Sequence, residues 1–478
     1  MTERRSNLAA LRKIVGSDHV KDDGDVLRLH AIDGVRPWAV VFPASAEEVS
    51  EVVRLAVREN LSLIPRGSGS KISKGTLPGR LDLVLCTERL NKILDLDTGN
   101  LTVTAQAGAR FSRIQVALAG EENRCYLPYN DQVTLSGEAV CSDRVNMGCF
   151  VPLMPSHTRS ATLGGIIAAN SSGPTRLLYG VPRDLLLGVR YVAPNGEIIG
   201  MGGKTVKNVS GYDVCKLMIG SHGSLGILCE MTLRILPLPE RLATGLSSFQ
   251  SLDEALSFVE RISGSRLLPA AVELINRKAW ELLGLEGSME PGKRGYGVAV
   301  AMEGVDEAVG RMSSEIKQWA LEAGALGIKE LEEEEHRRFW DAYCNHPAGL
   351  SDEYPGLVSA KLNYPVSVYG EIIESAEDSP PMDLALFCHA GSGVSLIHCL
   401  VAAEEAGLED RTVSYLTGLL EKCTEHGGNM VLERASSGLK GRLPVWGAPR
   451  GDLVVMRRMK KQIDPLGLFC PGRFIGGI

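Results

Sequence analysis

Three glycine-rich loops contain the residue types that bind phosphate groups. The first loop, residues 65–70, reads Pro-Arg-Gly-Ser-Gly-Ser, the second spans residues 160–173, and the third spans residues 220–227. Consecutive backbone N–H groups in a glycine turn form an anion-binding concavity, to which serine adds hydroxyl donors. A pyrophosphate fits this chemistry in the first loop. Any one of these loops alone is typical of a structural turn, but three at these separations indicate a bound ligand.

Two common nucleotide-binding motifs do not fit these loops. Gly203-Lys204-Thr205 resembles the end of a P-loop, but the glycine expected five residues earlier is Ile198. Gly67-x-Gly69 begins like a dinucleotide fingerprint, but Ile72 stands at the third glycine position. The glycines of these motifs are needed for the tight turn and the close approach to phosphate. The sequence therefore argues against an NTPase and against a nicotinamide-type site.

A β-α-β unit is predicted to position the first loop. The apolar run 38–42 reads as a strand, and Ser45 with Glu48 three residues later predicts the start of a helix that continues to about Asn60. Residues 61–64 form a second predicted strand that stops at Pro65, and the glycine turn follows at once. Such a turn is a common place for a cofactor phosphate. Further strands are expected near residues 81–85 and 101–105.

The remaining chain divides into an irregular stretch and a second domain. Residues 125–160 are irregular and contain Cys125, Cys141 and Cys149; a surface loop and a partner contact are both open for them. Pro237-Leu238-Pro239 predicts a domain boundary. Beyond it, helices predicted at 252–262 and 305–323 alternate with strands near 297–302 and 384–388. This order indicates an α+β domain with an antiparallel sheet.

The composition excludes several classes of protein. Of the 478 residues, 44% are hydrophobic and 53 are glycine, and the net charge is −7, which argues against a disordered chain and against nucleic-acid binding. The N-terminal residues lack the apolar segment of a signal peptide, and no window of 18 residues is apolar throughout. Eleven scattered cysteines without a Cys-x-x-Cys pair indicate reduced thiols and no iron–sulfur cluster of the chain's own. We therefore expect a cytoplasmic protein without a transmembrane segment, whose only membrane contact would be through partner subunits.

The three loops resemble those of the FAD-linked oxidases of the vanillyl-alcohol oxidase type, also called PCMH-type flavoproteins. Residues 206–213, Asp464-Pro465 and the segment 471–474 strengthen this resemblance, which covers residues 35–236 and 425–478 closely and the middle of the chain loosely. Within the superfamily, the chain is similar to the flavoprotein subunits of glycolate oxidase and D-lactate dehydrogenase. Residues 427–428 and 432–434, together with the C-terminal segment, resemble the smaller FAD-binding subunit of glycolate oxidase in particular.

The resemblance implies an α+β fold and a set of residues that contact FAD. A PCMH-type FAD-binding domain of two α+β subdomains would comprise residues 1–240, a cap domain with an antiparallel sheet residues 241–430, and a segment that returns to the FAD domain residues 431–478. Because residues 65–75 contain no histidine, non-covalent FAD is predicted, with His157 and Cys149 as the alternative attachment points. The implied FAD-binding residues are Pro65, Arg66, Gly67, Ser68, Gly69, Ser70, Thr162, Gly164, Gly165, Ala169, Ser171, Gly173, Gly220, Ser221, Gly223, Gly226 and Ile227.

Related metal-dependent dehydrogenases carry a motif of the form His-x-Gly-Asp-Gly-Asn-x-His and a later Glu-His pair. Here His389 keeps the first position, whereas Leu396 occupies the second, and His398 follows two residues later on the same face of a strand. At the later pair, Glu433 is followed by arginine. We therefore predict no bound metal, and His389, His398 and Glu433 are the residues that would bind one if it were present.

The resemblance also implies the reaction and the partners. A hydride would pass from the C–H bond of a small 2-hydroxy acid to flavin N5 while a base takes the hydroxyl proton. His389 is the predicted base, with a structural strand-end histidine as the alternative, and Lys361 is predicted to meet the substrate carboxylate, with an exposed lysine as the alternative. Lys207 and Arg176 are further cations near the FAD loops.

The predicted electron acceptor is an iron–sulfur partner subunit, and a second flavoprotein subunit is expected in the same complex. Two other functions are open at this point. One is a non-catalytic FAD-bearing subunit for electron transfer or assembly, which an eroded metal motif would suit. The other is oxidation of a phenol or alcohol, which would require an apolar cap pocket.

Overall fold

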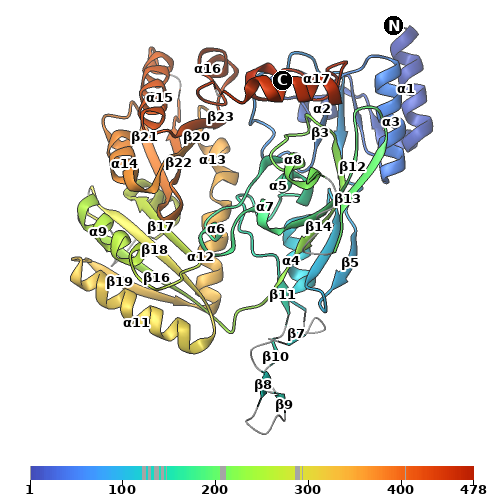
Figure 1. Cartoon of the computed structure of the whole chain (residues 1–478). Helices are drawn as coiled ribbons and strands as arrows, with labels where there is room; N and C mark the ends of the chain where they lie inside the picture. The colour runs from blue at the N-terminus through green and yellow to red at the C-terminus, as the bar shows by residue number, and fades with distance from the viewer. Residues whose placement is uncertain are drawn as a thin grey trace.

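The computed structural model describes residues 2–120, 125–126, 131–133, 139–141, 145–146, 148–204, 212–285, 291–292, 294–403, 405–449 and 451–478, and the side chains of 4–120 and of 148 onward within these ranges. The chain forms two lobes, one built mainly from the first half of the sequence and one from residues beyond 240 (Figure 1). No helix in the described ranges combines the length and the apolar composition needed to cross a membrane.

The first lobe begins with a four-stranded sheet in the order β1-β2-β4-β3, in which β2, β4 and β3 are parallel. Helix α3 (Ala46–Arg58) starts where the sequence predicted, because the Ser45 hydroxyl accepts a hydrogen bond from the Glu48 N–H at 3.2 Å. Its apolar face packs on the sheet. The other elements of this layer are α1 (Thr2–Val15), β1 (Val20–Lys21), α2 (Gly24–Leu29), β2 (Ala39–Val41), β3 (Leu63–Arg66) and β4 (Leu83–Cys86).

Strand β3 continues through Pro65, whereas the sequence predicted that it stops there. Pro65 pairs in register with Leu85 of β4, and Arg66 pairs with Cys86. Proline cannot donate to a ladder, but β3 lies at the edge of the sheet, where the missing donor is tolerated. The first glycine loop therefore begins one residue after the strand, at Gly67.

A five-stranded sheet in the order β13-β12-β14-β6-β5 forms the second layer of this lobe, and strand β5 was not predicted. Its hydrophobic core includes Leu163, Ile166 and Ile167 of helix α5, which places the second glycine loop against the sheet. The bounds are β5 (Ile93–Asp97), β6 (Thr102–Gln106), α4 (Phe111–Leu118), α5 (Leu163–Ala169), α6 (Arg176–Tyr179), α7 (Pro182–Leu185), β12 (Leu186–Val192), β13 (Ile198–Gly202), α8 (Val214–Met218) and β14 (Ile227–Arg234).

Three short two-stranded sheets accompany the second layer. The pair β11 and β15 is antiparallel, as are the pairs β7–β10 and β8–β9 in the stretch that the sequence predicted to be irregular. Their bounds are β7 (Cys125–Tyr126), β8 (Asp131–Val133), β9 (Ala139–Cys141), β10 (Val145–Asn146), β11 (Cys149–Phe150) and β15 (Leu236–Pro237).

The second lobe, which we call the cap, contains an eight-stranded antiparallel sheet in the order β19-β16-β18-β17-β21-β22-β20-β23. This confirms the predicted antiparallel sheet. The strands are β16 (Arg241–Phe249), β17 (Ala271–Asn276), β18 (Tyr296–Gly304), β19 (Gly327–Glu332), β20 (Val358–Asn363), β21 (Asp383–His389), β22 (Val394–Leu400) and β23 (Asn429–Arg434). The helices are α9 (Leu252–Ser263), α10 (Arg277–Leu282), α11 (Asp306–Glu322), α12 (Glu333–Asn345), α13 (Pro347–Glu353), α14 (Tyr369–Glu377) and α15 (Leu408–Glu425).

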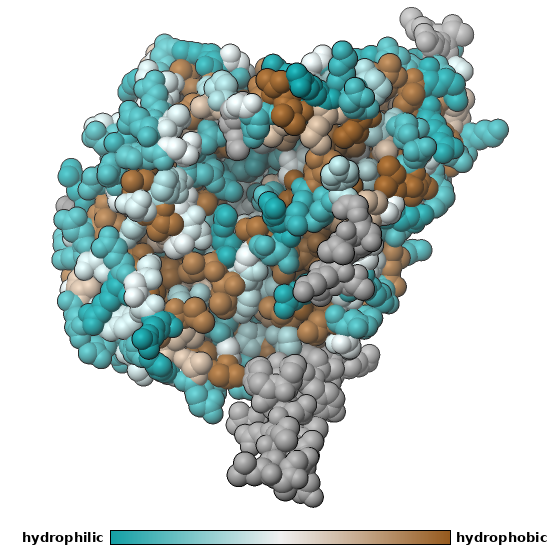
Figure 2. All heavy atoms as spheres, in the orientation of Figure 1, coloured by the Kyte–Doolittle hydropathy of each residue, from teal (hydrophilic) through white to brown (hydrophobic). Residues whose placement is uncertain are grey.

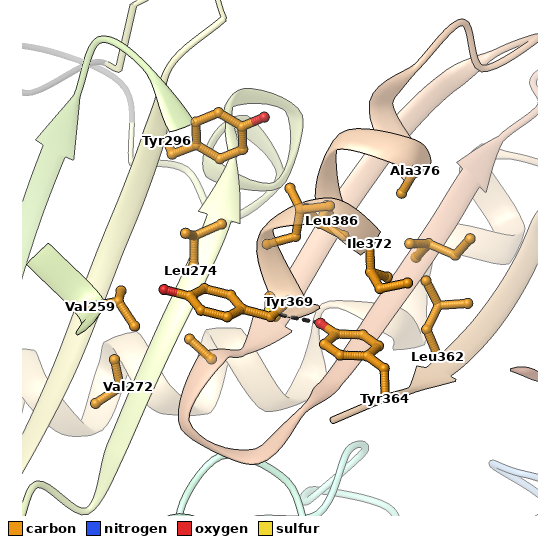
Figure 3. Close-up of a cluster of buried hydrophobic side chains, with 14 of the residues drawn as sticks. Val259, Val272, Leu274, Tyr296, Leu362, Tyr364, Tyr369, Ile372, Ala376 and Leu386 are labelled. Carbon is orange, nitrogen blue, oxygen red and sulfur yellow. Dashed lines mark hydrogen bonds between the residues drawn. The ribbon is translucent and has the colours of Figure 1, made fainter. Parts of the chain in front are cut away.

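Alternation along the cap strands gives the sheet two different faces. On β21, Leu386 and Cys388 join a hydrophobic cluster under α9, α11, α14 and α15, part of which is drawn in Figure 3. Phe387, between them, points to the other face, where it packs with residues of α12. His389 follows two residues later on that same face. Each face of the sheet therefore packs against its own hydrophobic cluster, and His389 lies on the face that packs with α12.

Residues near the C-terminus contact strand β3 of the first lobe. Helices α16 (Ser437–Arg442) and α17 (Leu453–Ile463) precede a segment in which Leu468 O accepts a hydrogen bond from Leu63 N–H, and Cys470 N–H donates to Leu63 O. This segment runs beside the edge strand β3. Because β23 belongs to the cap sheet, we propose that the cap extends to about residue 435, beyond the predicted boundary at 430; the boundary at 240 stays a prediction.

Candidate functional site

The three glycine loops meet around one cavity in the first lobe. A Cβ atom on Gly67 would lie 2.1 Å from Thr162 Oγ1, and one on Gly223 would lie 2.4 Å from the Pro65 ring. Only residues without a side chain allow this approach, so the first loop can touch both the second and the third. Residues of all three loops line this one cavity.

Most of the predicted FAD-binding residues line this cavity, which we call the cofactor cavity. Gly173 instead lines the neighbouring cavity toward the cap, and Gly220 lines neither. Those that line the cofactor cavity are Pro65, Arg66, Gly67, Ser68, Gly69, Ser70, Thr162, Gly164, Gly165, Ala169, Ser171, Ser221, Gly223, Gly226 and Ile227.

The first loop has the conformation that its composition predicts. Gly69 adopts a left-handed φ of +82°, and the Ser68 hydroxyl donates to the Ser70 hydroxyl at 3.3 Å. The Arg66 guanidinium is held by the Leu29 carbonyl at 2.9 Å. A turn of this kind, with a guanidinium beside it, fits a diphosphate.

Several residues of the cofactor cavity were not predicted as ligands. His222, Arg473 and Phe474 line it, and the His222 ring packs edge-on against Trp446 at 5.0 Å between centroids. His222 has a left-handed φ of +50°, which is unusual for a residue other than glycine. The sequence signal for this position was its place among the glycines of the third loop.

A second cavity, which we call the cap cavity, adjoins the first. The molecular surface is hollowed between the two lobes (Figure 2). The walls of the cap cavity come from the glycine loops of the first lobe and from the face of the cap sheet that carries His389. Residues that line both cavities are Ser70, Lys71, Lys74, Ser156, Ala169 and Ser171.

His389 lines the cap cavity and is fixed by a buried carboxylate. Its Nδ1 lies 2.7 and 2.8 Å from the two carboxylate oxygens of Glu273, which is fully buried on the adjacent strand β17. The Tyr343 hydroxyl donates to the same carboxylate. Because a carboxylate accepts the Nδ1 proton, the neutral ring has an unprotonated Nε2 that can accept a proton. Glu273 and Tyr343 were not predicted.

Two cations share the wall with His389. Burial lowers the pKa of the Lys361 ammonium to about 8 and also lowers the pKa of Arg176. In the described part of the chain, neither side chain forms an ion pair with a carboxylate. The predicted alternative of an exposed Lys361 is not what the structure shows, because this side chain lines the cavity. An anionic group entering the cavity would therefore meet two free cations.

Glu433 is paired with two lysines that follow the first glycine loop. Its carboxylate lies 2.8 Å from Lys74 Nζ and 3.7 Å from Lys71 Nζ. Burial alone would raise the pKa of Glu433, but Lys74, Lys71 and Lys361 together hold it well below its usual range. These ion pairs tie the FAD loop to the cap strand β23.

The three candidate metal ligands therefore have three different partners. His389 contacts Glu273, Glu433 contacts the lysines, and His398 Nε2 lies 3.0 Å from His346 Nε2. Among the residues that the structure describes, no group of His, Cys, Asp and Glu side chains has the arrangement of a metal site.

Some sequence predictions fall outside the described residues. Lys207 and most of the segment 206–213 are among them, and the side chains of Cys125 and Cys141 are not described either. Of the two alternative attachment points for flavin, His157 lines the cap cavity, whereas Cys149 is buried on β11 away from both cavities. Non-covalent attachment stays a prediction.

Sequence comparison places both halves of the chain in one group of proteins. The family "FAD binding domain" matches residues 37–137 and 142–214, and "FAD linked oxidases, C-terminal domain" matches residues 238–474. The chain is 28% identical over 444 residues to the glycolate oxidase subunit GlcD of Bacillus subtilis, which covers 91% of this chain and 88% of that protein.

Other relatives act on related acids according to their names. The chain is 27% identical over 489 residues to D-2-hydroxyglutarate dehydrogenase of Xanthomonas citri pv. viticola, covering 99% of this chain and 97% of the relative. It is 24% identical over 493 residues to D-lactate dehydrogenase of Anaerostipes hadrus, covering 99% and 96%. The fold matches the solved structure of p-cresol methylhydroxylase with a TM-score of 0.73 at 16% identity, over 99% of this chain and 97% of that one.

Proposed function

The chain belongs to the FAD-linked oxidases of the PCMH type, and we propose that within this family it oxidises a small 2-hydroxy acid. Membership makes it an FAD-linked oxidoreductase related to glycolate oxidase and to the D-lactate and D-2-hydroxyglutarate dehydrogenases. The observation that carries the proposal is the joint presence, in the cap cavity, of a carboxylate-held histidine and two free cations. A phenol oxidase would instead need an apolar wall at this place.

The cofactor would be held by the three loops. Arg66 and the turn 67–70 would bind the diphosphate, and the second and third loops would line the rest of the cofactor cavity. When bound, FAD supplies the hydride acceptor at N5. The residues shared by both cavities mark where substrate and flavin would meet.

The cap residues would orient the acid and take its proton. Lys361 and Arg176 would bind the substrate carboxylate, which fixes the position of the 2-hydroxyl. His389 Nε2 would accept the hydroxyl proton as the C–H bond loses its hydride, and the Glu273 carboxylate would stabilise the resulting imidazolium. The product is a 2-oxo acid, and the two electrons remain on the cofactor.

We further propose that the electrons leave through a partner subunit. The relatives from Bacillus subtilis and from Escherichia coli are named as subunits, and this chain has no cysteine spacing for a cluster of its own. An iron–sulfur subunit is the proposed acceptor, with a second flavoprotein subunit in the same complex. Similarity to the smaller FAD-binding subunit of glycolate oxidase stays a prediction.

Anaerobic reduction of the bound flavin tests the proposal. We expect glycolate, D-lactate or D-2-hydroxyglutarate to bleach the flavin absorbance, and His389→Asn to slow this reduction at least 100-fold with the FAD content unchanged. No bleaching by any hydroxy acid of the panel, together with reduction through a partner subunit, would instead favour the non-catalytic electron-transfer subunit.

Lys361→Met tests the carboxylate site separately. Removing a buried cation that binds an anion costs about 1.5–3 kcal/mol, so kcat/KM is expected to fall roughly 10- to 100-fold. Because the pKa of Lys361 is lowered to about 8, the cation is present below this pH and lost above it, and the kcat/KM of the native chain should fall as the pH rises through 8. The pH profile of Lys361→Met should lack this limb; Lys461→Met, on an exposed residue, is the control.

A further inference from the structure

A second group of polar residues lines the cap cavity without a part in the proposed chemistry. The Ser359 hydroxyl lies 2.8 Å from His398 Nδ1, His398 Nε2 lies 3.0 Å from His346 Nε2, and His346 Nδ1 lies 2.6 Å from the Tyr343 carbonyl oxygen. The three hydrogen-bonded side chains all line the cap cavity, and none lines the cofactor cavity; they are Ser359, His398 and His346.

The direction of each hydrogen bond in this series follows from the acceptor at its end, the Tyr343 carbonyl oxygen. A carbonyl oxygen can only accept, so His346 carries its proton on Nδ1 and its Nε2 accepts from His398. His398 then has a bare Nδ1, which accepts the proton of the Ser359 hydroxyl. The Ser359 hydroxyl therefore donates its proton to His398 Nδ1, and its oxygen presents only lone pairs to the cavity.

The strand register places Ser359 far from His389. Ser359 pairs with His398, which pairs with Ala385, and His389 lies four residues farther along β21. At about 3.3 Å per residue, this separation is roughly 13 Å along the strands. Lys361 lies between them, because it pairs with Leu396 on β22, which in turn pairs with Phe387 on β21. A two- or three-carbon acid held at His389 cannot reach Ser359.

The charges near Ser359 decide which chemical group it accepts. Three cations line this end of the cavity: Arg434, which pairs with Ser359 across β20 and β23, and Lys71 and Lys74, which are paired with Glu433 beside it. Lys361 is unpaired in the described part of the chain. A substrate ammonium would be repelled by these lysines, and a carboxylate would find no donor on the Ser359 oxygen. A neutral hydroxyl, which donates its proton, satisfies the lone pairs that the cavity presents.

We propose that Ser359, positioned by His398 and His346, is a subsite that binds a hydroxyl group at the far end of a 2-hydroxy acid longer than lactate. This subsite deepens the proposed function and rests on it for the reacting end of the substrate. An extended chain advances about 1.2 Å per bond, so the six bonds between the 2-hydroxyl and 6-hydroxyl oxygens of a six-carbon acid span roughly 7 Å. A hydrogen bond of about 2.8 Å at each end extends this to roughly 13 Å, the separation of His389 and Ser359 along the strands.

Binding of two acids that cannot be oxidised tests the subsite without turnover. Hexanoate and 6-hydroxyhexanoate lack the 2-hydroxyl and differ only in the terminal group, and their dissociation constants are measured by perturbation of the oxidised flavin spectrum in the holoprotein. We expect 6-hydroxyhexanoate to bind at least fivefold more tightly. Ser359→Ala should bring this ratio to about one, with hexanoate affinity unchanged.

The control is Ser395→Ala, a serine on the same sheet whose hydroxyl bonds Tyr364 on the opposite face. It should leave the ratio as in the native chain. Equal affinity for the two acids in the native chain, or an unchanged ratio in Ser359→Ala, would overturn the subsite.

Turnover separates this inference from the proposed function. With 2-hydroxyhexanoate and 2,6-dihydroxyhexanoate, the native chain should show a higher kcat/KM for the dihydroxy acid, and Ser359→Ala should remove the difference. If neither acid bleaches the flavin while the binding ratio persists, the proposed oxidation fails and the subsite stands. If lactate and both six-carbon acids react equally well, the oxidation stands and the subsite fails.

Discussion

Glu303 is a buried carboxyl at a contact between the two lobes. The hydroxyl of Tyr179, from helix α6 of the first lobe, donates to it at 2.7 Å, and His336 Nε2 on α12 lies 3.8 Å away. Burial raises the pKa of Glu303 to about 7 and lowers the pKa of His336 to about 4. This carboxyl therefore keeps its proton to a higher pH than an exposed glutamate does, beside an imidazole whose pKa is lowered.

Glu303→Gln should change how the stability depends on pH. A carboxyl whose folded pKa is about 7 favours the folded state below its unfolded pKa near 4.5, and this contribution is lost as the pH rises through 7. The full difference is roughly 3 kcal/mol. The free energy of unfolding, measured with denaturant, should therefore fall less between pH 5 and pH 8 in the variant than in the native chain. Equal losses would contradict the assignment, and Glu307→Gln, on an exposed residue, is the control.

The sequence predicted those site residues that stand in a recognisable short segment. It missed the residues whose role depends on a partner far away in the sequence. His389 and Lys361 stood in recognisable segments, but Glu273 is 116 residues from His389 and meets it only through the β17–β21 register. Ser359 and His346 gave no signal at all. A serine and a histidine separated by strands and a helix become a hydrogen-bonded chain only after the sheet forms.

At the scale of elements, the glycine loops show how turn chemistry builds a cavity. The β-α-β unit and the helix start at Ser45 were predicted correctly, because capping and apolar periodicity act over a few residues. Strand β3 was predicted to stop at Pro65, but the edge position removes the penalty that makes proline a strand breaker. The end of an element was thus decided by its place in the sheet.

Gly67→Ala should weaken FAD binding more than it weakens the fold. The new methyl group would lie 2.1 Å from Thr162 Oγ1, so the first and second loops must separate. We expect the FAD content after purification to fall at least tenfold, with a loss of only about 1–3 kcal/mol in the stability of the apoprotein. Gly79→Ala, where the nearest atom is at 3.6 Å, is the control and should keep its FAD. Full FAD content in Gly67→Ala would contradict the packing of these loops around the cofactor.

At the scale of the whole molecule, buried ion pairs hold distant segments around the cofactor cavity. Arg473 Nη1 lies 3.0 Å from Asp33, and Nη2 donates to the Lys74 carbonyl at 2.7 Å. Lys440 also contacts Asp33. These contacts join the N-terminal region, the first glycine loop and the C-terminal segment. None follows from sequence patterns, because each partner is hundreds of residues from the other.

Arg473→Leu should destabilise the whole protein and its cofactor site together. It leaves the Asp33 carboxylate with one cation and frees the carbonyls of the first loop, and removing one partner of a buried pair costs about 3–5 kcal/mol. Thermal unfolding should show a lower Tm, and flavin fluorescence should show released FAD. Arg458→Leu, on an exposed residue of α17, should change neither. A native Tm and FAD content in Arg473→Leu would show that the pairing is dispensable.

The contact between strand β3 and residues 468–470 has a consequence for the order of synthesis. The first glycine loop is translated about 400 residues before the backbone that supports it at Leu63 and before Cys470, Arg473 and Phe474 on its cavity wall. A nascent chain can therefore make its first sheet early, yet it can close the cofactor cavity only once residues 468–474 have been synthesised and have folded back. We expect chains stalled or truncated before residue 464 to lack FAD, so that flavin loading reports synthesis and docking of this segment.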